Sequence, residues 1–303
     1  MLSTQADLDE LRRRLDRIDD SLQDLLIERL EVVARVAAQK RSGTASPYVP
    51  SREAEMLRRL VARQGDAFPD GPLVRIWREL LGATTRAQGP FAVGAFAPPE
   101  TPGVWDLARD HYSSHAPMTA FQTAFQVIRA VAERRVAVGV LPMPQDGDGD
   151  PWWRHLLSRD AESPRIVARL PFGPRGNARS DNADALVIGF GAQQPSGQDR
   201  TLLVTENAVQ ISRGRMVSAF SAAGLTCTSL LSCEHAEAAN TLIEIDGFVQ
   251  LGDARLETLR GRLGADLYRL MAVGGYAMPL ETAASQVQPA MRLDTASRTA
   301  VRG

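Results

Sequence analysis

The chain has 303 residues, and its 35 Lys and Arg residues nearly balance its 36 Asp and Glu residues, which gives a formal net charge of −1. A chain of this length can form two or three domains. The charge balance gives no indication of a nucleic acid or an acidic membrane surface as a partner. The N-terminal part lacks the apolar core of a signal peptide, and no stretch approaches the roughly 18 to 20 apolar residues of a membrane span. The two cysteines, Cys227 and Cys233, suit reduced thiols. We therefore expect a cytoplasmic protein.

An apolar stripe runs at helical spacing from Leu8 to Lys40, and three cations, Arg12, Arg29 and Lys40, stand in or beside it. A cation in a packed helical seam costs several kcal/mol unless it is neutralised. The pattern therefore predicts a long packed helix that binds an anionic ligand; the alternative is an amphipathic helix whose basic side chains reach the surface. The apolar positions of the stripe are Leu11, Leu15, Ile18, Leu22, Leu25, Val33 and Val36.

The spacing of the three cations suggests how they are shared between sites. On an ideal helix Arg29 and Lys40 lie within roughly 20° of one face and about 16 Å apart, so both can bind one small molecule. Arg12 lies about 25 Å from Arg29 and about 100° round the helix. An antiparallel pair of helices in a dimer would bring the partner's Arg12 opposite Arg29, which indicates a composite site.

Residues 5–88 contain no convincing strand and divide into three predicted helices. The first extends to about residue 41, the second covers 52–64 with Ser51 as its N-cap, and the third covers 72–88 and opens at Pro72.

From Phe91 onward, short apolar runs (FAVGAF, VAVGVLP and ADALVIGFG) alternate with helical or loop segments, which indicates an α/β region. From TLLVTENAV at residue 201 the pattern predicts a βαββαβ unit, with two helices on one face of a four-stranded sheet. We place domain boundaries at 1–89, 90–197 and 198–280, and we expect residues 281–303 to be a flexible tail.

The helical part resembles the all-helical type of chorismate mutase over about residues 5–90. The matching segments are LRRRLDRIDDSLQDLLIERLEVVARVAAQK, SREAEML and ATTRAQ. One position departs from the family, because Val49 stands where many relatives have Asp. The family's polar site positions are occupied by Arg12, Arg29, Lys40, Arg52, Glu53, Thr84 and Gln88.

This resemblance implies an intertwined homodimer that rearranges chorismate to prephenate, the step that leads to phenylalanine and tyrosine, with no cofactor and no metal. It implies that Arg29 and the partner's Arg12 bind the two substrate carboxylates. Lys40 and Gln88 would donate hydrogen bonds to the ether oxygen. Glu53 would accept one from the substrate hydroxyl, and Arg52 and Thr84 would complete the polar lining.

Residues 90–197 resemble a reduced lobe of prephenate dehydratase. The segment VAVGVLPM matches a strand that in the family precedes Glu-Asn-Ser, and DNADALVIG matches the strand that carries Thr-Arg-Phe. Neither motif is kept, and the segment between the two strands is too short for a second lobe, so the comparison implies that dehydratase activity is lost. The residues at the six motif positions are Pro144, Gln145, Asp146, Asp184, Ala185 and Leu186.

Residues 198–280 resemble an ACT-type regulatory domain that ends in AVGGYAMPL, while the family's phenylalanine-binding motifs are replaced by QISRGRM and LSCEH. This leaves open whether the unit binds an effector or a partner, or serves dimerisation and stability. The leading hypothesis is a chorismate mutase with an inactive dehydratase-like half. The alternative is a non-catalytic regulatory protein acting through the ACT-like half, and a bifunctional mutase and dehydratase ranks last.

Overall fold

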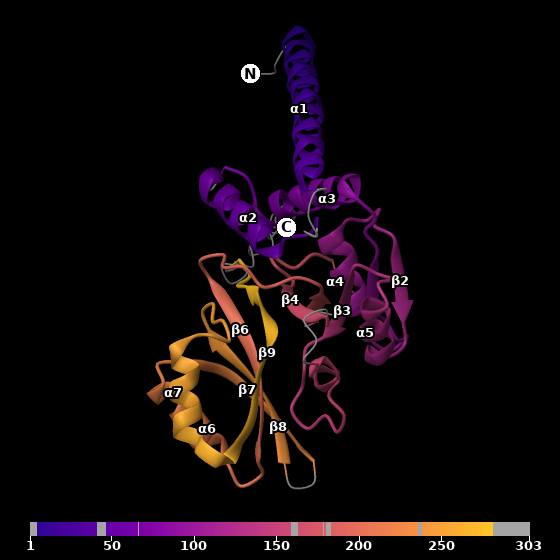
Figure 1. Ribbon diagram of the computed structural model, residues 1–303. Helices are drawn as coiled ribbons and strands as arrows, with labels where there is room; N and C mark the ends of the chain where they lie inside the picture. Colours follow the sequence, from indigo (N-terminus) through magenta and orange to yellow (C-terminus); the bar gives the residue numbers. More distant parts are fainter. Residues whose placement is uncertain are drawn as a thin grey trace, which may run out of the picture.

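The computed structural model describes residues 5–40, 47–65, 67–158, 163–177, 179, 183–235 and 238–280. The three predicted helices are confirmed as α1 (Gln5–Lys40), α2 (Pro50–Gln64) and α3 (Asp70–Gln88). Helix α1 projects away from the rest of the molecule, and α2 and α3 lie between it and the α/β part (Figure 1). The predicted tail at 281–303 lies outside the described residues.

Two predicted helix starts are wrong. Helix α2 begins at Pro50 after Val49, with no side-chain cap, so Ser51 is not the N-cap and is instead buried inside the helix. The fixed φ of proline favours the first helical position, where its missing N–H costs nothing. Helix α3 likewise begins at Asp70 rather than at Pro72, and its acidic first residue interacts favourably with the helix dipole.

The predicted α/β character is confirmed by one nine-stranded sheet in the order β2-β1-β3-β5-β4-β9-β6-β8-β7. Strands β1, β2 and β3 are parallel, and β5 runs antiparallel to both β3 and β4. Strands β2 and β4 fall outside the three apolar runs identified from the sequence. The strands of the first part are β1 (Val93–Phe96), β2 (Met118–Phe121), β3 (Val138–Pro142), β4 (Arg165–Leu170) and β5 (Ala185–Gly189).

Helices cover the first part of the sheet and fill its short connections. Helix α4 (Gly103–Tyr112) follows β1, α5 (Ala124–Ala132) follows β2, and the 3-10 helix η1 (Trp152–Leu156) follows β3. Helix α5 begins with a capping box between Thr123 and Gln126, which satisfies two backbone N–H groups at the helix start.

The βαββαβ order predicted for the last unit is confirmed. Leu203 of β6 and Ile243 of β8 share one core with Phe220 of α6 and Leu259 of α7, so both helices cover the same face (Figure 1). The elements are β6 (Asp199–Ala208), α6 (Arg213–Ala222), β7 (Cys227–His235), β8 (Ala238–Asp246), α7 (Ala254–Leu263), the 3-10 helix η2 (Gly264–Asp266) and β9 (Leu267–Ala277).

The two parts of the sheet join where β4 pairs with β9, at Ile166 and Gly274. Gly274 has φ +123°, and a Cβ there would overlap the backbone of Ile166. Glycine is required at this point because only it tolerates both this backbone conformation and so close an approach.

The helical part contacts the α/β part through hydrogen bonds and close packing. Arg58 of α2 donates to the backbone oxygens of Ser196 and Gln198 at 2.9 Å, and to that of Met278 at 2.7 Å. In α3, a Cβ at Gly82 would lie 2.5 Å from the carbonyl oxygen of Tyr112. Helices α3 and α4 therefore pack too closely there for any side chain.

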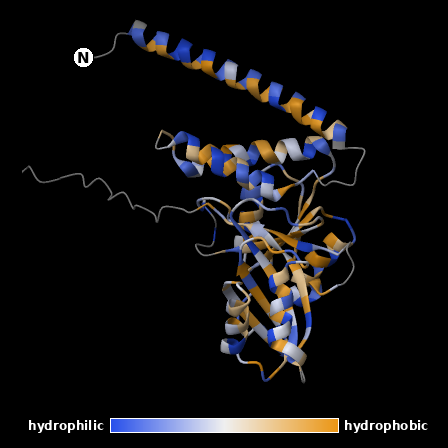
Figure 2. Ribbon diagram, turned by 60° about the vertical axis from the view of Figure 1, so that its left-hand side comes forward, coloured by the Kyte–Doolittle hydropathy of each residue, from blue (hydrophilic) through white to orange (hydrophobic). Residues whose placement is uncertain are grey.

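Helix α1 leaves its apolar stripe uncovered. Leu15 and Leu25 are each 59% exposed, and the stripe is visible along the projecting helix (Figure 2). Among the α1 side chains that the structure describes, only Arg29, Val33 and Ala37 are half-buried. Eleven large hydrophobic residues of this helix, from Leu8 to Val36, are exposed. A contiguous apolar surface of this length is typical of an interaction site.

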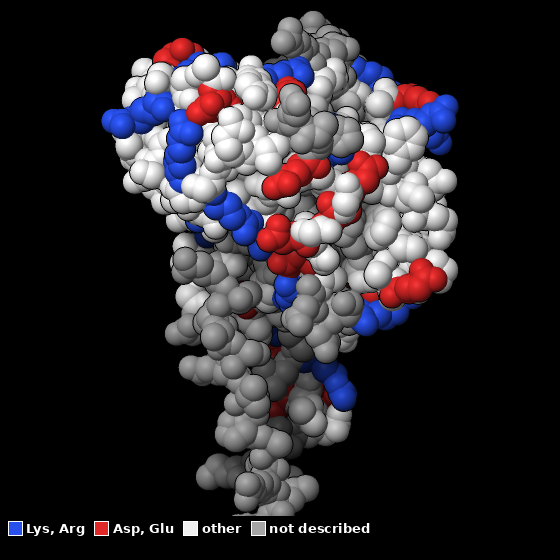
Figure 3. Space-filling view, turned by 90° about the horizontal axis from the view of Figure 1, so that it is seen from below, with Lys and Arg blue, Asp and Glu red and all other residues white. Residues whose placement is uncertain are grey.

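Surface charge of both signs is found at the end of the molecule opposite α1, where basic and acidic side chains share one face (Figure 3). Within the described residues, no helix combines the length and hydrophobicity that crossing a membrane requires.

Candidate active site

Three of the predicted site residues meet where the C-terminal half of α1 crosses α3. The Arg29 Nη1 donates to the Thr84 Oγ1 at 3.4 Å, and its guanidinium lies 5.6 Å from the ring centre of Trp77. The Thr84 hydroxyl donates to the backbone oxygen of Leu80 at 2.9 Å, and the Gln88 amide donates to the backbone oxygen of Thr84 at 3.2 Å. Partial burial lowers the pKa of Arg29 below its ordinary value. The Arg29 guanidinium thus meets the Thr84 hydroxyl, and Gln88 lies one helical turn further along α3.

Glu53 lies elsewhere, in a buried ion pair at the junction with the α/β part. Its Oε2 accepts from the Arg78 Nη1 at 2.8 Å, and the two side chains are only 12% and 5% exposed. In the described contacts the Glu53 carboxylate meets Arg78, and not Arg29 or Thr84. Burial raises the pKa of Glu53, and the charge of Arg78 opposes that rise.

Arg78 is a residue that sequence analysis missed. Its guanidinium lies 5.1 Å from the ring centre of Phe172, which belongs to the α/β part. A cation at a buried helical position, the pattern used for the first helix, could have identified it. Arg78 follows Val74 by four residues and so continues the buried face of α3. A cation on a buried helix face indicates a specific anionic partner.

Two further predicted residues, Arg12 and Arg52, do not join the cluster within one chain. Arg12 is exposed near the free end of α1 and pairs with Asp9 at 3.2 Å. Arg52 is exposed and pairs with Glu55 at 3.1 Å. Lys40 ends α1, and its side chain lies outside the described residues.

The positions that correspond to the dehydratase motifs carry different chemistry. Asp184 stands where the family has a threonine hydroxyl, and it is bound by Arg169 at 3.1 Å and by Arg175 at 2.5 Å. The next two residues, Ala185 and Leu186, are buried in β5. A carboxylate paired with two arginines therefore stands directly before β5, and buried apolar side chains follow it in the strand.

The helical part of the chain matches a known protein family. Residues 11–89 match the family model for chorismate mutase type II. The chain thus carries a chorismate mutase domain of this type in its N-terminal region, followed by a mixed α/β sheet region.

Curated relatives extend the similarity beyond the helical part. A bifunctional chorismate mutase/prephenate dehydratase of Aquifex aeolicus is 29% identical over 147 residues, covering 47% of this chain and 40% of that protein. Its counterpart in Pseudomonas aeruginosa is 28% identical over 153 residues, covering 49% and 42%. A T-protein of Enterobacter agglomerans is 48% identical over 52 residues, covering 17% and 14%. The chain spans less than half the length of these relatives.

Two solved structures show weaker similarity. A prephenate dehydratase from Streptococcus mutans aligns with a TM-score of 0.43 and 14% identity, over 63% of this chain and 99% of that one. A protein described as GqqA, a novel type of quorum quenching acylase, aligns with a TM-score of 0.44 and 16% identity, over 63% and 95%.

Proposed function

We propose that this protein is a chorismate mutase that converts chorismate to prephenate in phenylalanine and tyrosine biosynthesis in the cytoplasm. The observation that carries the proposal is the contact of Arg29 with Thr84, next to Gln88, within a region that matches the type II mutase family. All seven polar positions of the family site are also present in the sequence. Cations that destabilise an empty pocket are easily lost when a site decays.

The proposed reaction needs binding and electrostatics rather than a nucleophile. Chorismate is a flexible dicarboxylate, so the site must hold it in its reactive conformer. Arg29 offers the planar donor pair that binds a carboxylate. Negative charge develops on the ether oxygen as the C–O bond breaks, and Gln88 and Lys40 are assigned as donors to it.

By the family pattern Glu53 is assigned to the substrate hydroxyl, although in the single chain its carboxylate is bound by Arg78 away from the Arg29 cluster. Arg78 holds the Glu53 carboxylate in place and opposes the rise in its pKa that burial causes. Arg52 and Thr84 complete the polar lining.

The site is proposed to be completed by a second copy of the chain. The exposed stripe of α1 is the surface for pairing, and helices that pair along such a seam bury it lengthwise. An antiparallel partner would bring its own Arg12 to Arg29, about 25 Å along the helix from the Arg12 of the same chain. Isologous contacts of this kind are the commonest in homodimers.

The α/β half is proposed to have no dehydratase activity. The Thr and Arg of the dehydratase motif are replaced by Asp184 and Ala185, and the carboxylate of Asp184 is held by two arginines. The βαββαβ unit is proposed to be ACT-like, and its continuous sheet with the lobe suits a role in stability.

A chorismate-consumption assay on the purified full-length chain tests the function. We expect turnover above the uncatalysed rate, and Arg29→Ala should lower kcat/KM by roughly a hundredfold or more. Arg129→Ala, an exposed arginine on α5, is the control and should match wild type. The absence of turnover, or equal rates for Arg29→Ala and wild type, would instead support a non-catalytic binding protein. The release of phenylpyruvate from prephenate would refute the loss of dehydratase activity.

A further inference from the structure

A cavity of about 700 Å³ lies at the junction of α3, α4 and the segment 171–177. It is separate from the Arg29 cluster, since neither Arg29 nor Thr84 nor Gln88 lines it. Its volume falls in the range of small-molecule sites, about 300 to 1,000 Å³. A second cavity of about 620 Å³, near the start of α2, has one cation in its lining, Arg134.

The wall of the junction cavity is strongly basic. Among the described residues, four arginines and one carboxylate, Asp110, line it. The carboxylates that bind these arginines from elsewhere, such as Glu53 and Asp184, are not part of the wall. Arg78 and Arg175 are thus already paired from outside the cavity and Arg75 is paired within it, whereas Arg109 has the longest ion pairs of the four. The four arginines are Arg75, Arg78, Arg109 and Arg175.

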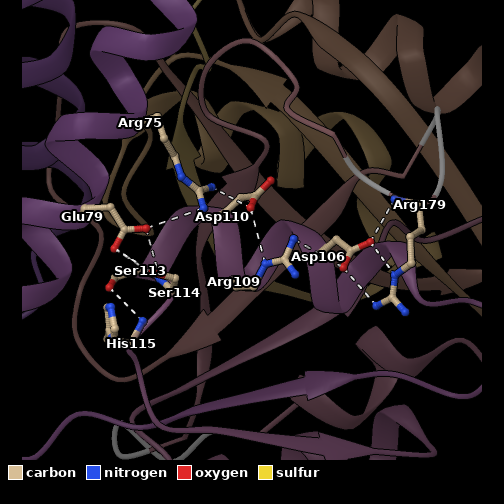
Figure 4. Close-up of polar contacts among 9 residues, drawn as sticks. All are labelled: Arg75, Glu79, Asp106, Arg109, Asp110, Ser113, Ser114, His115 and Arg179. Carbon is tan, nitrogen blue, oxygen red and sulfur yellow. Dashed lines mark hydrogen bonds and ion pairs between the residues drawn. The ribbon is translucent and has the colours of Figure 1, made fainter.

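Arg109 is the cation most available to a ligand. Figure 4 shows a row of alternating charges that joins α3 and α4. In this row Arg75 holds Asp110 at 2.6 Å, whereas Arg109 reaches Asp110 only at 3.7 Å and Asp106 only at 3.8 Å. Asp106 is also held at 2.9 Å by Arg179. Because its carboxylate neighbours have shorter bonds to other arginines and its side chain is 43% exposed, Arg109 can turn to a new anion.

The rest of the wall is apolar or neutral. Val74, Leu107 and Phe172 contribute apolar side chains. His111 is buried beside Arg78, and this burial, together with the nearby cation, lowers its pKa well below its ordinary value. The neutral imidazole adds no further charge to the cavity. The lining thus combines a cationic mouth with an apolar wall.

We propose that this cavity binds a small carboxylic acid with an apolar body, held first by Arg109, with Arg175, which is 41% exposed and already bound to Asp184, as a second donor. The carboxylate would meet the guanidinium groups and the apolar body would lie against Phe172. An ammonium group is disfavoured, because Asp110, the one carboxylate among the described lining residues, is already bound by Arg75 at 2.6 Å. The site therefore selects simple acids over zwitterionic amino acids of the same size.

Titration calorimetry of the full-length protein with 3-phenylpropanoate tests the proposal, with phenylalanine as the zwitterionic comparison. We expect saturable binding of 3-phenylpropanoate and affinity for phenylalanine lower by about tenfold or more. Arg109→Gln and Arg175→Gln should each lower the affinity for 3-phenylpropanoate by a similar factor. Arg129→Gln, at an exposed helical arginine with its own carboxylate partner, should bind like wild type.

Arg29→Ala separates this site from the proposed mutase site, and it should leave the affinity for 3-phenylpropanoate unchanged. The proposal is overturned if wild type shows no saturable binding at millimolar concentration, or if Arg109→Gln and Arg175→Gln both bind as wild type does. Loss of binding in Arg29→Ala, with retention in the other two, would also overturn it. None of these readouts depends on mutase turnover.

Discussion

The carboxylate of Glu53 is held by Arg78 at 2.8 Å in a contact that joins α2 to α3 and is almost closed to solvent. Phe172 of the α/β part lies 5.1 Å from the same guanidinium. One residue of the proposed mutase site is thereby packed against a region outside the mutase domain. The stability and the pH response of the helical part should both depend on this pair.

Removing Arg78 should strongly destabilise the protein. Arg78→Met leaves the Glu53 carboxylate buried without its cation, which typically costs about 3 to 5 kcal/mol. The double variant Glu53→Leu with Arg78→Met removes both charges and should recover most of the loss. Urea unfolding measures both effects. If the single and double variants are equally unstable, the cost lies in packing rather than in the unpaired charge.

The loss of folding stability caused by Arg78→Met should become larger as the pH rises. Burial raises the pKa of Glu53 above its ordinary value of 4.5, and Arg78 opposes the rise, so the variant should have a still higher pKa. When the pKa of a carboxyl is higher in the folded than in the unfolded protein, the native state is favoured at pH values below the unfolded-state pKa. This contribution to stability is lost as the pH rises through the folded-state pKa. The free-energy difference from wild type should therefore be larger at about pH 8 than at about pH 5. A difference independent of pH would show that Glu53 is not responsible.

Mixing two inactive variants should restore activity if the site is shared between chains. Refolding Arg12→Ala together with Arg29→Ala produces heterodimers in which one of the two sites has both arginines. Random pairing predicts about a quarter of wild-type turnover. The matched control mixes Arg29→Ala with Gln88→Ala, which lie in the same site and should restore nothing. Turnover in the control, or none in the test mixture, would contradict the shared site.

The uncovered stripe of α1 should be needed for assembly. Replacing Leu15 and Leu22 with Glu places charges on the apolar seam, where burial of an unpaired charge is costly. We expect a monomer by light scattering, with chorismate turnover lost. Glu substitutions at Asp16 and Asp20, on the polar side of the same helix, should leave the assembly unchanged. If the variant with Glu at positions 15 and 22 remains a dimer, the interface lies elsewhere on the chain.

Gln88 should make the mutase rate insensitive to pH, because an amide donates its hydrogen bond without a titrating proton. We expect wild-type kcat/KM to stay nearly constant from mildly acidic to neutral pH, between about pH 6 and about pH 8. Gln88→Glu can donate only when protonated, so its kcat/KM should fall as the pH rises. A steep decline in the wild-type enzyme over the same range would argue against this role of Gln88.

Restoring a side-chain cap should stabilise α2. Val49 occupies the N-cap and makes no side-chain hydrogen bond there, whereas Asp can accept from the first free N–H groups. Val49→Asp should raise the free energy of unfolding by about 0.5 to 1 kcal/mol. Val49→Leu, which cannot cap, serves as the control. Equal stability of the two variants would mean that another group already satisfies the helix start.

The helices and the βαββαβ order could be predicted from the sequence, whereas two helix starts and the strands β2 and β4 could not. Periodicity is a local property, so the apolar stripe of α1 and the βαββαβ order could be predicted without long-range information. Arg29, Thr84 and Gln88 were singled out from the family pattern, and the structure brings Arg29 to Thr84, one helical turn from Gln88.

The contacts between distant elements could not be predicted from the sequence and are seen only in the folded chain. Glu53 and Arg78 are 25 residues apart, and the bond from Arg58 to Ser196 spans 138. Such pairings depend on how helices dock on a sheet, which no local pattern specifies. The joining of β4 to β9, the basic wall of the junction cavity and the burial of Glu53 all arise from that docking.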